Sequence, residues 1–358
     1  MKDIFYYKPS VRKTAARVFS VYSSALAKKS GNILFRTLLP YDTAHFTSFD
    51  LTKYNFDDDL DEYVRDWTEA SLNSMEFRRN VDDDFIPTLS PMLGIGDYSA
   101  FVAGDIYFQP DTSWSKPSLI DIDDYKNFAP LGESVWYKRF MYICEGIIKV
   151  CARHQIPFMR GFFSPLDLAA ALRGEEIYYD FYDQPDKLHA LLDYCADATV
   201  FLAKDLYTLA ENYLSSAEYG LLWTTKMINM SEDIACMISA DLYRRFCAPA
   251  TQKVIDAFGS GHMHCHSRAM YLVREICSLK NVANLWLATD PNQPRPIDNI
   301  EKLNKAASCT CLAIDCDTFE EIEQNISLLK QGNYSICLPV HSTDEAIALT
   351  DRFNKLFG

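Results

Sequence analysis

Several signatures of common protein classes are missing from this chain of 358 residues. It contains no Cys-x-x-Cys pair, so a zinc ribbon or a thioredoxin-type site has no support. No segment has the length and apolar character of a membrane span, and the first residues lack the apolar run of a signal peptide. We therefore expect a cytoplasmic protein in which most of the 11 cysteines are small buried residues.

Positively charged side chains are also in deficit. The chain has 35 Lys and Arg against 49 Asp and Glu, which gives a net charge of −14. Nucleic acids and anionic membranes attract proteins through cationic groups, so neither is an expected partner. The composition, 48% hydrophobic and 23% charged, is nevertheless typical of a chain that folds around a large core.

No internal repeat stands out, and short apolar segments instead alternate with longer segments of helical period. The expected strands are 33–39, 85–89, 101–107, 156–163, 220–225, 261–266, 284–289, 310–315 and 334–340. The expected helices are 60–79, 137–154, 167–172, 185–213, 240–258 with an interruption near Pro249, 271–278, 300–306, 319–329 and 344–356.

This alternation favours an α/β fold, namely a (β/α)₈ barrel of about eight parallel strands surrounded by helices. A doubly wound open sheet is the competing fold. The Gly-x-Gly-x-x-Gly and Gly-x-x-x-x-Gly-Lys-Ser/Thr phosphate-binding motifs are absent, which removes support for a nucleotide-binding version of it. We expect one domain over residues 1–358, with residues 1–59 as an N-terminal helical addition packed on the barrel.

Three of the seven histidines lie at alternate positions in one short segment. Alternate residues of a strand share a face, so His262, His264 and His266 should point one way, and Met263 and Cys265 the other. In a barrel, the C-terminal ends of the strands carry the active site. Because imidazole nitrogens bind zinc well at neutral pH, the pattern indicates a zinc site that includes His264 and His266.

A third ligand is available where His341 follows the last expected strand. Strand ends converge on one mouth of a barrel, so His341 is compatible with the same site. Cys265 or Cys337 in place of a histidine is an alternative, although the alternation puts Cys265 on the opposite face. In the alternative without a metal, the histidines line a pocket and His341 caps the last helix.

Charged residues elsewhere extend the candidate site. Asp290 and Asp315 each follow an expected strand, where an acid orients a histidine, acts as a general base or caps a helix. Four arginines are candidates for binding an anion: Arg78, Arg79, Arg160 and Arg268. Arg160 is the most unusual, because a charge within an apolar strand needs a partner or a function. The run Asp82-Asp83-Asp84 is interpreted as a solvated loop, since nothing near it resembles a calcium loop.

Several motifs resemble those of the uroporphyrinogen decarboxylase superfamily, over roughly residues 60–358. These motifs are Phe163-Ser164-Pro165-Leu166-Asp167-Leu168-Ala169 with Leu172-Arg173-Gly174, Asp180-Phe181-Tyr182-Asp183-Gln184-Pro185, and Ile238-Ser239-Ala240-Asp241 with Phe246 and Pro249. The resemblance implies a (β/α)₈ barrel, in agreement with the pattern of strands and helices.

The superfamily implies two chemistries. One is cofactor-free decarboxylation of the acetate side chains of uroporphyrinogen, and the other is zinc-dependent methyl transfer between a methylated corrinoid or methyl donor and a thiol. The decarboxylases hold carboxylates with an Arg-rich N-terminal segment, whereas the stretch Phe35–Pro40 here has a single arginine. The methyltransferases bind zinc through His-x-Cys and a late cysteine, and the resemblance places His264-Cys265-His266 and His341 at those positions.

The first functional hypothesis is therefore zinc-dependent methyl transfer linked to a corrinoid or thiol acceptor. Zinc is held by His264, His266 and His341. The substrate is a small molecule, and its contacts are assigned to Arg160, Arg268 and Asp290. A corrinoid protein and a homodimer are the partners considered.

The second hypothesis is a metal-free decarboxylase of an anionic, porphyrinogen-like compound. In it, His341 and Arg160 hold a carboxylate, Asp84 assists protonation, and no cofactor is required. The third hypothesis, from a different class, is a barrel that binds a corrinoid or tetrapyrrole without turning it over.

Overall fold

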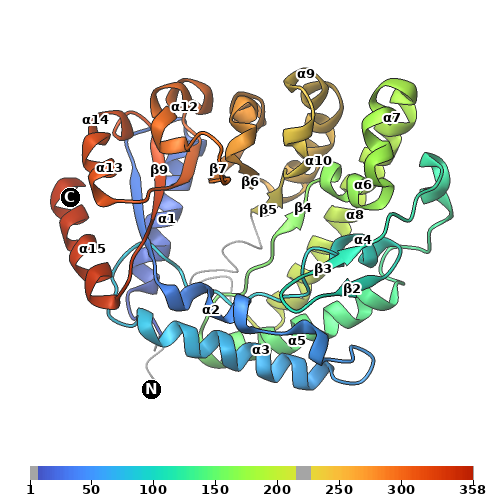
Figure 1. Ribbon diagram of the computed structural model, residues 1–358, viewed down its shortest axis with the longest axis horizontal. Helices are drawn as coiled ribbons and strands as arrows, with labels where there is room; N and C mark the ends of the chain where they lie inside the picture. Colours follow the sequence, from blue (N-terminus) through green and yellow to red (C-terminus); the bar gives the residue numbers. More distant parts are fainter. Residues whose placement is uncertain (1–6, 215–226, 358) are drawn as a thin grey trace.

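A parallel sheet of seven strands organises the computed structural model, which describes residues 7–214 and 227–357 (Figure 1). Along the sheet, the strands are β1 (Ile33–Leu38), β9 (Asn333–Pro339), β8 (Cys311–Asp315), β7 (Val282–Ala288), β6 (Gly261–His266), β5 (Ile228–Ser231) and β4 (Phe162–Phe163). Each neighbouring pair is parallel. Parallel neighbours need long crossover connections, and helices supply them.

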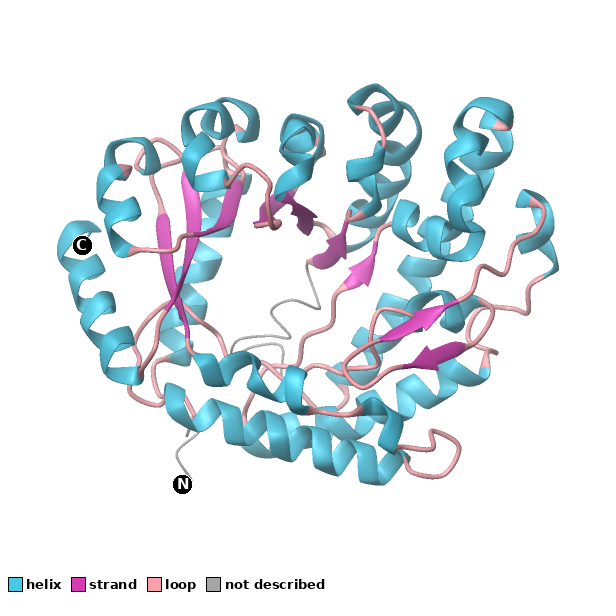
Figure 2. Ribbon diagram, viewed as in Figure 1, coloured by secondary structure: helices cyan, strands magenta, loops and turns pink. Residues whose placement is uncertain are grey.

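Helices surround this sheet, as Figure 2 shows. The α-helices are α1 (Val11–Leu26), α2 (Pro40–Ser48), α3 (Leu60–Met75), α4 (Asp97–Val102), α5 (Val135–His154), α6 (Pro165–Arg173), α7 (Ile177–Asp183), α8 (Pro185–Glu211), α9 (Ala240–Leu242), α10 (Ala248–Phe258), α11 (Val273–Ser278), α12 (Ile300–Ala307), α13 (Phe319–Gln324), α14 (Ile326–Leu329) and α15 (Thr343–Phe357). Among the described residues, none of these helices combines the length and the apolar character that a membrane crossing requires.

Short helical turns and one hairpin complete the fold. The turns are η1 (Leu51–Lys53), η2 (Glu76–Arg78), η3 (Ile122–Asn127), η4 (Gly174–Glu176), η5 (Ile234–Met237), the π-helical η6 (Tyr243–Cys247), η7 (Ser267–Leu272) and η8 (Pro296–Asn299). The hairpin consists of β2 (Ile106–Phe108) and β3 (Ser113–Ser115), which pair antiparallel outside the main sheet.

Local sequence explains where the elements around the site begin and end. The Ser164 hydroxyl accepts a hydrogen bond from the Asp167 N–H (3.2 Å), and Pro165 occupies the first turn of α6, where no N–H is needed. Gly259 ends α10 in the left-handed conformation (φ 91°), which glycine adopts without strain. β6 can therefore begin two residues later, at Gly261.

Most elements predicted for the second half of the chain are confirmed within a few residues. β6 has the predicted bounds, and the helix predicted at 240–258 is interrupted by η6 just before Pro249. The strand predicted at 220–225 lies outside the described residues. β5, at 228–231, is not among the predicted strands.

The prediction of a strand at 101–107 is wrong for most of its length. Residues 97–102 form α4, all of whose residues are buried, and the nearest strand is 106–108, in the small hairpin. A short apolar run of a buried helix cannot be distinguished from a strand by its pattern alone. The strand predicted at 156–163 is reduced to β4 and one parallel bridge between Leu89 and Phe158.

The segment 84–89 contacts both edges of the sheet through its backbone. At one end, the Asp84 N–H donates to the Phe35 carbonyl of β1 (2.7 Å). At the other end, the Leu89 N–H donates to the Pro157 carbonyl (3.0 Å), and the Met159 N–H donates to the Leu89 carbonyl (2.9 Å). The segment predicted as strand 85–89 thus spans the distance between β1 and the chain that leads into β4. The fold is an α/β fold with a seven-stranded parallel sheet.

Helix α1 covers the N-terminal ends of several strands. Its buried side chains form one hydrophobic cluster with residues at the starts of β1, β7 and β8. The cluster contains Val18, Val21, Tyr22, Ala25, Leu34, Met227, Ala283 and Cys311. The segment 1–59 therefore contributes both a packed helix and, through β1, a strand of the sheet itself.

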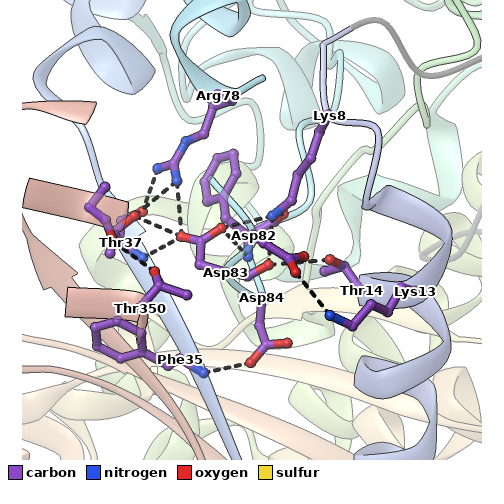
Figure 3. A network of polar contacts seen from close by, with 12 residues as sticks. Lys8, Lys13, Thr14, Phe35, Thr37, Arg78, Asp82, Asp83, Asp84 and Thr350 are labelled. Atoms are coloured by element: carbon purple, nitrogen blue, oxygen red, sulfur yellow. Dashed lines mark hydrogen bonds and ion pairs between the residues drawn. The ribbon is translucent and has the colours of Figure 1, made fainter. Parts of the chain in front are cut away.

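A buried network of charges fixes the loop before residue 85 to β1 and to the N-terminal segment (Figure 3). Asp83 is 4% exposed and accepts hydrogen bonds from Lys8 Nζ (2.7 Å), Arg78 Nη1 (3.0 Å) and both the N–H and hydroxyl of Thr37 (2.7 Å each). Burial would raise the pKa of Asp83, but the charges of Lys8 and Arg78 lower it on balance. The interpretation of this acidic run as a solvated loop is wrong for Asp83 and Asp84, because both are buried and hydrogen-bonded.

Candidate metal centre

The histidines of β6 alternate as the sequence pattern predicts. Met263 and Cys265 are fully buried in the core, whereas His262, His264 and His266 are partly exposed. The rings of His264 and His266 lie with their centroids 5.0 Å apart. Strand geometry alone therefore brings two imidazoles together at the C-terminal end of β6.

Asp233 completes a group of three metal-binding side chains with these two histidines. Its Oδ1 lies 3.3 Å from His264 Nε2 and 3.4 Å from His266 Nε2. Tetrahedral zinc with bonds of about 2.0–2.1 Å keeps its ligand atoms roughly 3.3–3.4 Å apart, so both distances to Asp233 fit such an ion. Among the described residues, no other set of three His, Cys, Asp or Glu side chains is placed to share an ion.

Asp290 holds the second nitrogen of His266. Asp290 Oδ1 lies 2.8 Å from His266 Nδ1, and Asp290 Oδ2 accepts a hydrogen bond from the Arg268 N–H (3.0 Å). The contact with Asp233, together with Asp290, raises the pKa of His266 to about 9. A histidine whose Nδ1 is held by a carboxylate presents Nε2 in a fixed direction, which is the usual arrangement around a metal ligand.

Asp167 fixes the turn that carries Asp233. Its two carboxylate oxygens accept hydrogen bonds from the Ser231 hydroxyl (2.6 Å) and from the N–H groups of Asp233 and Ile234 (3.0 Å each). Burial, with the charge of Asp233 nearby, raises the pKa of Asp167 to about 6. The position of Asp233 thus depends on a buried acid at the start of α6.

His264 and His262 lie deeper and differ from His266 in their surroundings. Burial lowers the pKa of His264, and it lowers that of His262 to about 3, so both imidazoles are neutral at physiological pH. The ring of His264 packs at 4.5 Å from that of Trp286, centroid to centroid. A neutral imidazole has a free lone pair, which is the form that binds a metal.

A cavity of about 610 Å³ lies inside the sheet beside this group. Asp233, His262, His264 and Trp286 line it, and so do β1, the segment 84–88 and the chain around Arg160. A volume of this size lies in the range of small-molecule sites, and such sites are mostly apolar with a few convergent polar groups.

The structure places the other predicted site residues at different points. His341 is exposed beyond β9, where its N–H donates to Glu345 Oε2 (2.7 Å), and it does not join the group around Asp233. Cys265 is buried on the opposite face of β6, and Cys337 lies on β9 in register with Arg36. Arg268 is exposed beside Met237, with its Nη2 3.7 Å from the Met237 sulfur.

Two predicted residues line the cavity away from the metal-binding group. Arg160 is buried, pairs with Asp97 (2.5 Å) and lies over the ring of Tyr98 at 4.6 Å. The expectation that this arginine needs a partner is thereby met by an acid of α4. Asp84 accepts a hydrogen bond from the Phe35 N–H (2.8 Å), and burial raises its pKa.

Asp233 is the residue of the metal-binding group that the sequence prediction omits. No strand is predicted over 228–231, where β5 leads to Asp233, and the predicted strand 220–225 lies outside the described residues. The signal is present in Ile228-Asn229-Met230-Ser231, where apolar and polar residues alternate before two acids, Glu232 and Asp233. Alternation followed by acidic residues indicates a strand whose C-terminal end carries polar groups.

One protein-family model matches a region of this chain that contains all three residues of the metal-binding group. The family model of uroporphyrinogen decarboxylase (URO-D) matches residues 105–348, which is more than half of the chain and includes β4 to β9. The chain belongs to the uroporphyrinogen decarboxylase family. The predicted resemblance to that superfamily is thereby confirmed.

Two known proteins are similar to this URO-D family member, one in sequence and one in structure. The Methylcobamide:CoM methyltransferase MtbA of Methanosarcina mazei is 25% identical over 158 residues, which are 43% of this chain and 42% of that protein. The match thus spans less than half the length of that relative. A solved methyltransferase from Methanosarcina mazei superposes with a TM-score of 0.59 over 98% of this chain and 99% of its own, at 12% identity. That second similarity establishes the fold.

Proposed function

We propose that this URO-D family member catalyses methyl transfer linked to a corrinoid or a thiol, at a zinc site formed by Asp233, His264 and His266. The observation that supports it most is the convergence of one carboxylate oxygen and two imidazole nitrogens beside a cavity of about 610 Å³. Two histidines and one carboxylate are a ligand set of catalytic zinc sites, which leave a fourth position for substrate. When bound there, zinc acts as a Lewis acid and lowers the pKa of a nucleophile.

The protein residues of this site perform separate tasks. Asp290 holds Nδ1 of His266, so that Nε2 faces Asp233. Asp167 fixes the backbone of this turn by accepting hydrogen bonds from the N–H groups of Asp233 and Ile234. The ring of Trp286 packs against that of His264, with the centroids 4.5 Å apart. Together these contacts hold the ligand atoms in place before any ion arrives, which reduces the cost of assembling the site.

The proposal differs from the sequence-based hypothesis in its third ligand. Asp233 takes the place that the sequence pattern gave to His341, since Asp233 is adjacent to both histidines and His341 is exposed. The methyl-transfer part rests on the similarity to a Methylcobamide:CoM methyltransferase over 158 residues. A corrinoid or corrinoid-carrying protein and a small thiol are therefore the partners that we propose.

Zinc content and affinity of the untagged full chain test the metal site. We expect about one zinc per chain by elemental analysis after dialysis. Replacing any one ligand, as in Asp233→Ala, His264→Ala or His266→Ala, should weaken zinc binding at least tenfold. His341→Ala is the matched control and should leave zinc affinity unchanged. Loss of zinc with His341→Ala but not with Asp233→Ala would restore the sequence-based ligand set instead.

The reaction is tested with methylcobalamin as methyl donor and a panel of small thiols as acceptors. Loss of the cobalt–carbon bond changes the absorption spectrum of the cobalamin, so turnover can be followed directly. We expect thiol-dependent demethylation by the zinc-loaded chain, and none by His264→Ala. Demethylation at equal rates in both proteins would contradict the proposed role of the site.

A second candidate function is metal-free decarboxylation, which the position of Asp84 favours. Asp84 lines the same cavity, and burial raises its pKa, as a proton donor near neutral pH requires. Arg160, its predicted partner in this reaction, is already paired with Asp97. Activity on an anionic substrate that persists in chelator and is lost in Asp84→Asn would favour decarboxylation over methyl transfer.

The hydrogen bonds of residues 84–89 also support the closed barrel expected from the sequence. The segment bonds to β1 at Phe35 and to the chain before β4 at Pro157 and Met159. We include in the proposal that this segment takes the place of the eighth strand of the barrel, between β1 and β4 at the two edges of the seven-stranded sheet. Amide hydrogen exchange tests this, because the Asp84 and Leu89 N–H groups should then exchange as slowly as those of β1.

A further inference from the structure

Arg36 is an arginine inside the cavity that makes no ion pair with any acid of the described chain. Its side chain lines the cavity from the middle of β1, and its Nε is buried without a hydrogen-bond partner. No carboxylate within residues 7–214 and 227–357 lies within 4.0 Å of its guanidinium. A guanidinium that is partly buried and unpaired is costly to maintain, and a bound anion removes that cost.

The other charges of the cavity wall already have partners. Arg160 pairs with Asp97 (2.5 Å), Asp42 pairs with Arg78, and Asp84 lies 3.4 Å from Arg17. Asp315 lies close to Arg36 along the sheet but beyond ion-pair distance. Burial raises the pKa of Asp315, and the positive charge of Arg36 only partly opposes this increase. Apart from the metal-binding group, Arg36 is thus the charged side chain of the described wall that has no ion-pair partner. One such charge matches a monoanion better than a phosphate dianion.

An aromatic surface faces the same space. Trp286 is 40% exposed although it lies on an inward-facing position of β7, so much of its indole borders the cavity. In register with it, the next two strands carry Ala313 and Ser335, and β1 then carries Leu34. Adjacent strands are about 4.8 Å apart, so the two small residues leave a gap of roughly 10 Å beside the indole. This gap can hold a flat ring against the indole.

Arg36 stands at one end of that gap. It lies two residues beyond Leu34 on β1, and hence on the same face. Its guanidinium is close enough to His262 to contribute, after burial, to the low pKa of that imidazole. The fork of an arginine matches the two oxygens of a carboxylate, so a ring beside Trp286 can present a carboxylate to Arg36.

From this arrangement we infer that the cavity contains a subsite for a small planar aromatic monocarboxylate, with the ring against Trp286 and the carboxylate on Arg36. The subsite deepens the proposed function, because it assigns the class of small molecule that shares the cavity with the metal-binding group. It rests on residues other than Asp233, His264 and His266. Binding of the carboxylate and binding of zinc can therefore fail separately.

The test is calorimetric titration of the full chain with benzoate, with and without zinc. Three further ligands separate the contributions: benzamide keeps the ring and lacks the charge, cyclohexanecarboxylate keeps the charge and lacks the flat ring, and inorganic phosphate has neither the ring nor a single charge. We expect saturable binding of benzoate, with benzamide at least tenfold weaker and cyclohexanecarboxylate several-fold weaker. Absence of benzoate binding, equal binding of benzamide, or tighter binding of phosphate would each overturn the inference.

Variants assign the contacts. Arg36→Gln should weaken benzoate at least tenfold and leave benzamide unchanged, whereas Trp286→Leu should weaken both. Arg245→Gln, at an exposed arginine, and Trp114→Leu, at a tryptophan of the small hairpin, are the matched controls and should bind benzoate as the wild type does. Circular dichroism of each variant checks that it is folded. If a variant fails to fold, the four ligands on the wild-type chain still decide the outcome. Benzoate affinity within a factor of two in folded Arg36→Gln would refute the carboxylate contact.

Discussion

Asp83 and Asp84 are neighbouring buried carboxylates that should respond in opposite ways to the same substitution. Asp83 accepts hydrogen bonds from two cations, from the N–H and hydroxyl of Thr37 and from the Phe85 N–H. Asp84 accepts one from the Phe35 N–H (2.8 Å) and lies 3.4 Å from Arg17, whose side chain is 41% exposed. The pKa of Asp83 is lowered by its cations against the effect of burial, whereas burial raises that of Asp84.

The magnitudes follow from what each substitution leaves behind. Asp83→Asn leaves Lys8 buried without a carboxylate, whereas Arg78 keeps its pair with Asp42. Breaking a buried ion pair as at Lys8 costs about 3–5 kcal/mol of unfolding free energy. All three ammonium N–H groups of Lys8 are used in this network, so it cannot turn to water. Asp84→Asn keeps an oxygen for the Phe35 N–H and removes a charge that burial disfavours. Its effect should lie between zero and about 1 kcal/mol of added stability.

The two effects also differ in their dependence on pH. A carboxylate with a lowered pKa stabilises the fold above its unfolded pKa of about 3.9, and this contribution is lost as the pH falls through the lower folded value. A carboxylate with a raised pKa costs stability as the pH rises from about 3.9 through the raised folded value. The loss in Asp83→Asn should therefore persist down to about pH 4, whereas the gain in Asp84→Asn should vanish there.

Urea unfolding followed by circular dichroism at pH 7 and pH 4 measures both changes. At pH 7 the midpoint of Asp83→Asn should fall by roughly 1 M, and that of Asp84→Asn should stay or rise. Lys13→Ala is the matched control: it removes the exposed pair with Asp82 (2.9 Å) and should cost less than about 0.5 kcal/mol. Equal losses in Asp83→Asn and Asp84→Asn would refute the assignment of Asp83 as the counter-ion of two buried cations.

Two further predictions concern the metal-binding group and the backbone. Asp290→Asn should weaken zinc binding by about 10- to 100-fold in competition with a chromophoric chelator, because His266 Nδ1 loses its carboxylate partner; unchanged affinity would contradict this. Gly259→Ala should cost about 1–2 kcal/mol, since its φ of 91° strains an L-residue but nothing lies within 4 Å of the new methyl group. Gly94→Ala should cost clearly more by thermal unfolding, because its Cβ would lie 2.1 Å from the Ser113 nitrogen at a φ of 78°. A smaller loss at Gly94 than at Gly259 would contradict the second prediction.

The sequence predicts the parts of this site that depend on one segment. The outward and inward residues of β6 follow from alternation, which is a local property, so His264 and His266 could be paired without knowing the fold. The capped start of α6 at Ser164 is local in the same sense.

Contacts between distant segments are beyond such patterns. Asp233 meets His264 because β5 lies beside β6 with Ser231 in register with His264, and that register is a property of the assembled sheet. The partner of Arg160 is Asp97, which is 63 residues away, so the need for a partner was predictable but its identity was not. Asp83 is likewise in an acidic run that gives no local sign of Lys8, 75 residues before it.

The pairing of β1 with β9 has a consequence for how the protein is made. Asn32 and Asn333, 301 residues apart, are hydrogen-bonded where the first strand of the sheet meets the last. Contacts of such long separation slow folding, because a very large loop must close before they form. During synthesis, Arg36 and the other β1 residues of the cavity wall stay without β9 until residue 339 has left the ribosome. The edge of β1 that faces β9 is then unpaired for almost the whole of translation, and an exposed strand edge can pair with other chains during that period.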